Sequence, residues 1–180
     1  MVIATWSQWR ARRRSERFAE AERAAARAFE ILDELAASVV AAGAARVERH
    51  TVDWGDDGRH PVAELRPESP GCAAVAVEPV PGARWINVSL GEPYPGGDVH
   101  ELDVTDGWEE ELRARVEAAV EGRYRYREYE GRFGGTISEM AIVDADGEER
   151  TISVASSPDE PSMPTEESYE PYLAATTSET

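Results

Sequence analysis

The sequence predicts an α+β fold in which a mostly antiparallel sheet is flanked by a long N-terminal helix and a second, shorter helix. Two observations predict the helices: apolar residues recur every three or four positions before residue 43 and again between residues 106 and 121. A third predicts the sheet, because elsewhere the apolar residues alternate with period two in short runs that are bounded by turn residues.

The first helix is predicted to end at Gly43, and its most periodic part starts near Ser15. Thr5 and Gln8 stand at the spacing of a capping box upstream of it. One narrow apolar stripe follows, formed by Phe18, Ala21, Ala25, Phe29, Leu32, Leu35 and Val39. The less periodic first turns are expected to project beyond the domain or to fray.

The sheet is predicted from eight short runs along the rest of the chain: Arg46 to Trp54, Val62 to Arg66, Cys72 to Glu78, Arg84 to Leu90, Asp98 to Val104, Tyr124 to Glu130, Thr136 to Val143 and Glu149 to Ala155. The run from Cys72 is nearly continuous in apolar residues and therefore predicts a central strand. The run from Asp98 is expected at an edge. The last two runs are joined by the turn Asp144-Ala145-Asp146-Gly147, which is typical of a hairpin.

The second helix has clear boundaries in the sequence. Asp106 is placed to cap it, Glu109 follows three residues later, and Gly122 is placed to end it. Its predicted apolar face consists of Trp108, Leu112, Val116, Ala119 and Val120.

Three segments are therefore predicted. Residues 1–14 form a helical N-terminal extension, and residues 15–155 form a single α+β domain. Residues 156–180 contain four prolines, six acidic residues and no basic residue, a composition that is typical of a disordered tail.

The charge of the chain is strongly negative and unevenly distributed. It has 36 acidic and 19 basic residues, a formal net charge of −17, and nearly all of the excess lies beyond residue 50. Such a field attracts a basic partner and repels nucleic acid and membrane headgroups, so neither is an expected partner. No apolar run reaches the roughly 20 residues that a membrane span needs. The arginines near the N-terminus follow a short apolar start, the reverse of a secretory signal, so we expect a cytoplasmic protein.

No motif of catalytic or cofactor chemistry occurs in the chain. Cys72 is the single cysteine, so it forms no internal disulfide, and its apolar run predicts that it is buried. The three histidines, His50, His60 and His100, match no metal-ligand spacing and are interpreted as surface residues. We therefore expect no enzymatic activity, no metal and no cofactor.

Alternating arginines form a stripe on one of the predicted strands, at Arg123, Arg125 and Arg127. Such a stripe could contact RNA or phosphate. The acidic surroundings instead favour pairing with carboxylates on adjacent strands.

The candidate binding site is an acidic stretch at a strand-to-helix junction, next to an aromatic residue that its Pro/Gly loop predicts to be exposed. It consists of Tyr94, Asp98, Glu101, Asp103, Asp106, Glu109, Glu110 and Glu111. An acidic rim around an aromatic anchor suits a basic protein surface. A merely solvated face accounts for the same residues equally well.

The stretch WEEELRARVEAAVEGRYRYREYEG, with the Gly-turn, strand, DADG turn and final strand that come after it, resembles the immunity proteins of polymorphic and contact-dependent toxin systems. The resemblance covers about residues 84–155 and lies in layout rather than in an invariant motif. It implies a cytoplasmic protein of actinobacterial type that occludes the active site of one cognate toxin and performs no chemistry of its own.

The expected function is therefore the inhibition of a basic protein through an acidic surface. Two alternatives remain open. One is a secretion-system chaperone or adaptor that holds its client with the long helix and with Trp6 and Trp9. The other is a small-molecule-binding domain or enzyme with a pocket between the sheet and the helices, lined by His50, Tyr124 and Tyr126. The long helix is also compatible with a homodimer.

Overall fold

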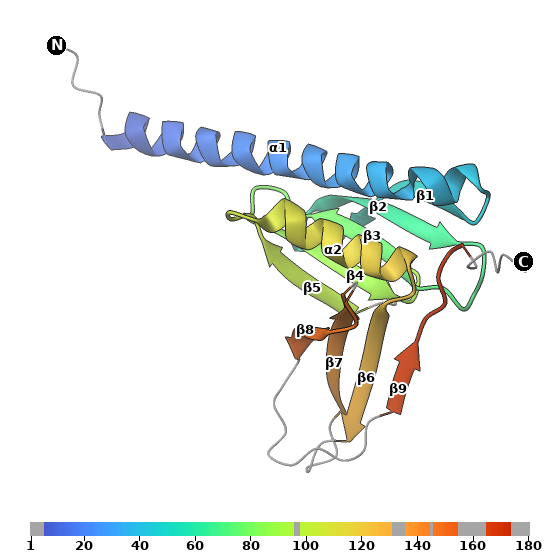
Figure 1. Cartoon of the computed structure of the whole chain (residues 1–180). Coiled ribbons are helices and arrows are strands. Elements are labelled where there is room, and N and C mark those ends of the chain that lie inside the picture. The colour runs from blue at the N-terminus through green and yellow to red at the C-terminus, as the bar shows by residue number, and fades with distance from the viewer. Residues whose placement is uncertain (1–5, 96–97, 131–135, 145, 155–164, 174–180) are drawn as a thin grey trace, which may run out of the picture.

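The computed structural model describes residues 6–95, 98–130, 136–144, 146–154 and 165–173. Two α-helices and two antiparallel sheets follow one another along these residues, as Figure 1 shows: α1 (Trp6–Ala41), β1 (Ala45–Asp53), the 3-10 turn η1 (Gly55–Asp57), β2 (Arg59–Pro67), β3 (Ala74–Pro79), β4 (Trp85–Gly91), β5 (Asp98–Asp103), α2 (Trp108–Val120), β6 (Tyr124–Glu130), β7 (Thr136–Val143), β8 (Glu149–Val154) and β9 (Thr165–Ser168). The predicted α+β class is confirmed.

The strands form two sheets rather than the single one expected. The first is a five-stranded meander in the order β1-β2-β3-β4-β5, and the second has the order β8-β7-β6-β9. All pairings are antiparallel. Strand β3 is central and β5 lies at an edge, as their sequence patterns predict.

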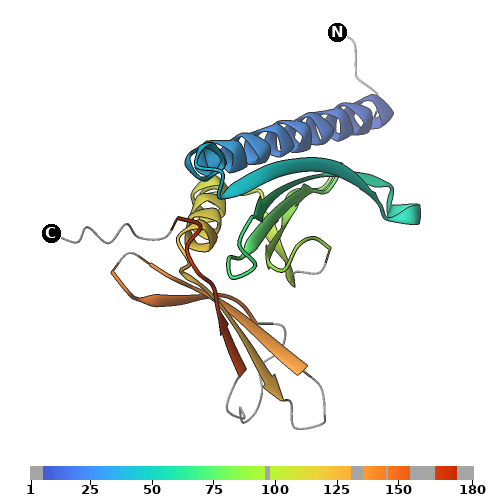
Figure 2. The ribbon, with the colours of Figure 1, turned by 90° about the vertical axis from the view of Figure 1, so that its right-hand side faces the viewer.

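Both helices cover one face of the five-stranded sheet (Figure 2). Helix α1 buries a stripe that differs from the predicted one: Ala24, Ala28, Ile31, Leu32, Ala36 and Val39 are buried, and of the predicted residues only Leu32 and Val39 are among them. Helix α2 buries Leu112 and Val116 against the same core. Strands β2, β3 and β4 contribute their alternate residues Ala63, Leu65, Val75, Val77, Ile86, Val88 and Leu90. Period-two strands present one apolar face and α1 presents one apolar stripe, so these surfaces bury each other.

Helix α1 runs without a break from Trp6, and its N-terminal half extends past the sheet (Figure 1). Phe18 remains 49% exposed there. Helix α2 begins after Gly107, which adopts a left-handed conformation and occupies the capping position. The predicted cap by Asp106 is therefore wrong, because the chain turns into the helix through the backbone of Gly107 without a side-chain cap.

The C-terminal segment departs most from expectation. Residues 165–168 form β9, which pairs with β6, and residues 169–172, here called the C-terminal strap, continue to the first sheet. Tyr172 is buried, its hydroxyl bonds to the carbonyl of Ala73, and its N–H donates to the carbonyl of Val120 at 2.9 Å. Disorder is therefore wrong for residues 165–173, whose aromatic side chain joins the core. The remainder of the predicted tail, residues 155–164 and 174–180, lies outside the described residues.

Candidate functional site

The face of the five-stranded sheet opposite the helices, here called the open face, carries two buried carboxylates, Glu64 and Glu78. Alternation along β2 and β3 places Glu64 and Glu78 on this face while their neighbours enter the helix-covered core. Glu64 is completely buried and Glu78 is 1% exposed. Burying a carboxylate is costly unless hydrogen bonds or counterions replace its water, so their partners are informative.

Four side chains from separate segments converge on the Glu78 carboxylate. Oε1 accepts hydrogen bonds from Trp54 Nε1 at 2.6 Å and from His60 Nδ1 at 2.8 Å. Oε2 accepts from Asn87 Nδ2 at 3.0 Å and from the Tyr94 hydroxyl at 3.1 Å. These four donors saturate the two oxygens of the carboxylate.

The hydrogen bonds keep Glu78 ionised despite its burial. Burial raises the pKa of the carboxyl group, but the bonds from Asn87, Trp54, His60 and Tyr94 together outweigh it, so the pKa is lower than usual. A saturated carboxylate has no lone pair left for a substrate proton. This cluster therefore organises the open face and is not placed to act as a general base.

Glu64 anchors the loop between β4 and β5. Its Oε1 accepts the backbone N–H of Tyr94 at 2.9 Å, and its Oε2 lies 2.9 Å from Arg66 Nη2. Tyr94 packs on Val62 and Ala76 and is 6% exposed. The prediction that Tyr94 is an exposed anchor is therefore wrong, because two carboxylates of the sheet hold the loop down over the open face.

Two tryptophans are exposed at the end of the open face beyond Tyr94. Trp54 is 45% exposed and Trp85 is 37% exposed. They share one region because Trp54 bonds Glu78, and Glu78 is paired with Asn87, two residues from Trp85 on the same strand. Neither tryptophan is among the site residues predicted from the sequence. Two signals in the sequence could have indicated them: Trp54 stands at the end of a predicted strand, and Glu78 is a carboxylate inside the apolar run of β3.

Two of the predicted acidic residues lie on the edge strand β5, next to the strand that carries Trp85. Asp103 is paired directly with Trp85, and Glu101 with Asn87. Both carboxylates are exposed, and neither forms an ion pair within the described part of the chain. We call Trp54, Trp85, Glu101 and Asp103 the open-face patch.

The other predicted acidic residues do not extend this surface. Glu109 accepts a hydrogen bond from Arg27 of α1 at 2.8 Å, and Glu111 bonds Arg115 at 2.9 Å. Glu110 and Asp106 are exposed, and Asp98 lies in β5 with a side chain outside the described set. The predicted group of eight therefore does not form one surface, because Glu109 pairs with α1, Glu111 pairs with Arg115 and with Arg150 of β8, and Tyr94 is buried on the open face.

The arginines of the described chain are largely paired within the molecule. Arg127 alone contacts carboxylates from three strands, Glu139, Glu149 and Glu166. Arg125 donates to the carbonyl oxygens of Gly122 and Tyr124. The sequence predicts pairing with carboxylates of adjacent strands for all three arginines of the stripe, and this is confirmed for Arg127 only; Arg123 pairs instead with Glu121, which precedes the strand. Because these arginines are already paired, the excess negative charge of the molecule is carried by exposed carboxylates.

The histidines and the cysteine show no arrangement for metal or nucleophilic chemistry in the described residues. His60 is buried beside Glu78, so the surface interpretation is wrong for it, and His100 is half-buried with its Nε2 atom shielded from solvent. Cys72 is buried as predicted, and burial raises the pKa of its thiol. Within the described ranges, no group of three or more His, Cys, Asp or Glu residues is placed to hold a metal ion.

Neither helix in the described part of the chain combines the length and apolar composition that crossing a bilayer requires. No family model matches the chain, and neither a curated protein nor a solved structure shows detectable similarity to it.

Proposed function

We propose that this chain is a non-catalytic binding protein that captures a basic protein on the open-face patch, and that this partner is a cognate toxin of the kind that immunity proteins neutralise. One observation carries the proposal: of the two exposed tryptophans at this end of the open face, Trp85 is paired across the strands with Asp103, an exposed carboxylate that has no cationic partner among the described residues. The toxin identity rests on the resemblance in sequence layout alone.

The chemistry of the patch suits a basic surface. Tryptophan is enriched among the residues that contribute most to binding energy, because its large rigid ring buries much apolar area for little lost freedom. Charges at the rim of an interface chiefly raise the association rate and select the partner. Glu101 and Asp103 border Trp85 in this way, and a net charge of −17 adds long-range attraction for a cation.

The saturated Glu78 cluster supports binding rather than catalysis. Its four donors come from β2, from β4, from the turn between β1 and β2, and from the loop that carries Tyr94. Together they hold the open face in one conformation. A pre-organised surface loses less entropy on association.

The test compares two double variants with the same change of charge. Glu101→Lys with Asp103→Lys reverses the open-face patch, and Glu110→Lys with Glu117→Lys reverses exposed carboxylates of α2. Tagged wild type and both variants are used as baits in a lysate of the cells that produce the protein, with elution by a salt series. We expect wild type and the α2 variant to retain one basic protein, and the patch variant to lose it. The association rate of this protein with the patch variant should be about tenfold lower than with wild type.

The captured protein then provides the functional arm. Its expression alone should arrest growth, co-expression of wild type should restore growth, and co-expression of the patch variant should not. Retention of the partner by the patch variant and its loss from the α2 variant would move the interface to the helix side. A captured protein that is harmless when expressed would refute the toxin assignment while leaving the binding surface intact.

A further inference from the structure

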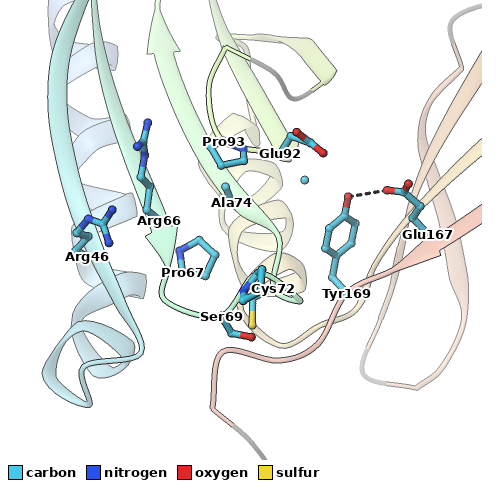
Figure 3. Close-up of a pocket in the computed structure, with 12 residues that line it drawn as sticks. Arg46, Arg66, Pro67, Ser69, Cys72, Ala74, Glu92, Pro93, Glu167 and Tyr169 are labelled. Atoms are coloured by element: carbon cyan, nitrogen blue, oxygen red, sulfur yellow. Dashed lines mark hydrogen bonds between the residues drawn. The ribbon is translucent and has the colours of Figure 1, made fainter.

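A cavity of about 470 Å³ lies at the opposite end of the open face, between the ends of β1 and β2 and the segment that leads into the C-terminal strap (Figure 3). This volume lies within the range of about 300–1,000 Å³ that is usual for small-ligand sites. The cavity shares no residue with the open-face patch, so a ligand bound here would be independent of the function proposed above.

The floor of the cavity is apolar. Cys72, Ala74 and Gly91 line it and are buried, and Pro67 and Pro93 add ring carbons to the sides. Apolar surface of this kind favours a ligand with a hydrocarbon portion.

The arginine side of the cavity is already neutralised. Arg46 donates to Glu48 and Glu68, both at 2.7 Å. Arg66 lies 2.9 Å from Glu64 and 3.2 Å from Glu48. Three carboxylates therefore surround two guanidinium groups, and this side carries no excess positive charge for an anionic ligand.

The opposite side carries unbalanced negative charge. Glu92 and Glu167 both line the cavity and are exposed, and neither has a cationic partner in the described ranges. The Tyr169 hydroxyl donates to Glu167 at 3.3 Å and lies so near Gly91 that a Cβ there would come within 2.9 Å of it. Because Gly91 precedes Glu92, the hydroxyl contact brings the two carboxylate-bearing segments together. Figure 3 shows both carboxylates and the hydroxyl on this side.

We propose that this cavity binds an organic cation, with a primary ammonium or guanidinium head between Glu92 and Glu167 and an apolar stem on the buried floor. The ring of Tyr169 lines the cavity and would lie beside the stem. This ring is stacked on the ring of Tyr124, with 5.3 Å between the two centroids. A free amine or guanidine and the side chain of a lysine or arginine in a peptide share this chemistry.

The first test uses two probes that differ only in the head group, n-hexylamine and 1-hexanol, titrated into the full-length protein and followed by two-dimensional NMR. We expect the amine to bind at least tenfold more tightly, with shifts at Cys72, Gly91 and Tyr169, and its affinity to fall as salt screens the carboxylates. Equal binding of the two probes, or shifts that do not map to the cavity, would overturn the proposal.

Neutral variants test the two carboxylates. Glu92→Gln and Glu167→Gln should each weaken hexylamine binding about fivefold or more, and the double variant should bind amine and alcohol alike. Glu148→Gln is the matched control, because this exposed carboxylate on the turn between β7 and β8 does not line the cavity. All of these side chains are exposed, so the fold should persist in each variant, which the NMR spectra report directly. A Glu92→Gln, Glu167→Gln double variant with unchanged amine affinity would refute the assignment.

The second test distinguishes the two sources of the cation. Agmatine represents a free guanidine, and N-acetyl-Gly-Arg-Gly-amide presents the same head group on a peptide. Tighter binding of agmatine would assign a small-molecule ligand, and tighter binding of the peptide would assign a protein side chain. If neither binds more tightly than 1-hexanol, the proposal fails.

Discussion

Glu78 illustrates how a single residue can have a role that its own sequence environment hides. The apolar run that contains it correctly predicts a central strand, and nothing in that run predicts four hydrogen-bond donors. Trp54, His60, Asn87 and Tyr94 approach it from segments between 9 and 24 residues away in sequence. Only the register of β2, β3 and β4 and the path of the loop bring them together.

His100 provides a prediction for the pH dependence of stability. Burial first, and then the positive charge of Arg115, lower the pKa of its imidazole from 6.5 to about 4. The unfolded state therefore binds more protons than the folded state between these two pH values, so His100 makes stability fall as the pH falls through this window. Between pH 7 and pH 5 its contribution to the loss is about 2 kcal/mol.

The measurement is urea unfolding of wild type and His100→Gln at pH 7 and pH 5. We expect wild type to lose about 2 kcal/mol more than the variant between the two pH values. The carboxylates whose pKa values are also lowered, such as Glu34 and Glu149, are common to both proteins and cancel in the comparison. An equal loss in both proteins would show that His100 titrates normally in the folded state.

Local periodicity predicted the regular elements well. Strands β6 and β7 have the predicted bounds, and α1 and α2 end before Gly43 and Gly122 as expected. These elements are amphipathic, so their pattern is visible without knowledge of the partner surface. Strand β9 and the C-terminal strap were missed because β9 is exposed along its length and the strap has a single buried aromatic, Tyr172.

Two glycines with similar backbone angles test how the strap is held. Gly122 has a φ of 69° and Gly147 a φ of 85°, so alanine is strained at both. A Cβ at Gly122 would lie 2.6 Å from the backbone nitrogen of Pro171, whereas a Cβ at Gly147 would meet nothing within 4 Å. We expect Gly147→Ala to cost about 1–2 kcal/mol, from backbone strain alone.

Gly122→Ala should cost more than Gly147→Ala and should also displace the strap. Because the strap covers Cys72, whose thiol contacts the carbonyl of Pro171, the reaction of this thiol with a maleimide reports displacement. We expect the thiol to react at least tenfold faster in Gly122→Ala than in Gly147→Ala. Similar rates in the two variants would show that the close contact with Pro171 does not hold the strap in place.

In the molecule as a whole, the strap joins the two sheets. Its Glu170 N–H donates to the carbonyl of Gly71 at 2.8 Å, Tyr172 enters the core beneath α2, and β9 upstream of it pairs with β6. A chain that ends at residue 164 would lose one strand of the second sheet and this connection. Hydrogen exchange should then become at least tenfold faster in β6 and β7, with a smaller effect in β2 and β3.

Strands β2 and β3 serve as the internal control in that exchange experiment, because the helices cover them and the strap does not pair with them. Unchanged protection of β6 after truncation would show that the second sheet is stable without β9. A uniform loss of protection would instead show that both sheets unfold as one cooperative unit.

Periodicity and composition were sufficient to predict the α+β class, both helices, eight of the nine strands in the described residues, the burial of Cys72 and the excess of negative charge. These properties depend on neighbours along the chain, so a linear pattern contains them. Tertiary contacts, in contrast, set which carboxylates are saturated, which are ion-paired and which are exposed. Glu78, Glu109 and Glu101 are the same residue type, and they differ because the partners that reach them come from distant segments. The open-face patch and the cavity likewise depend on strand register and on the docking of residues 165–173, which no local pattern encodes.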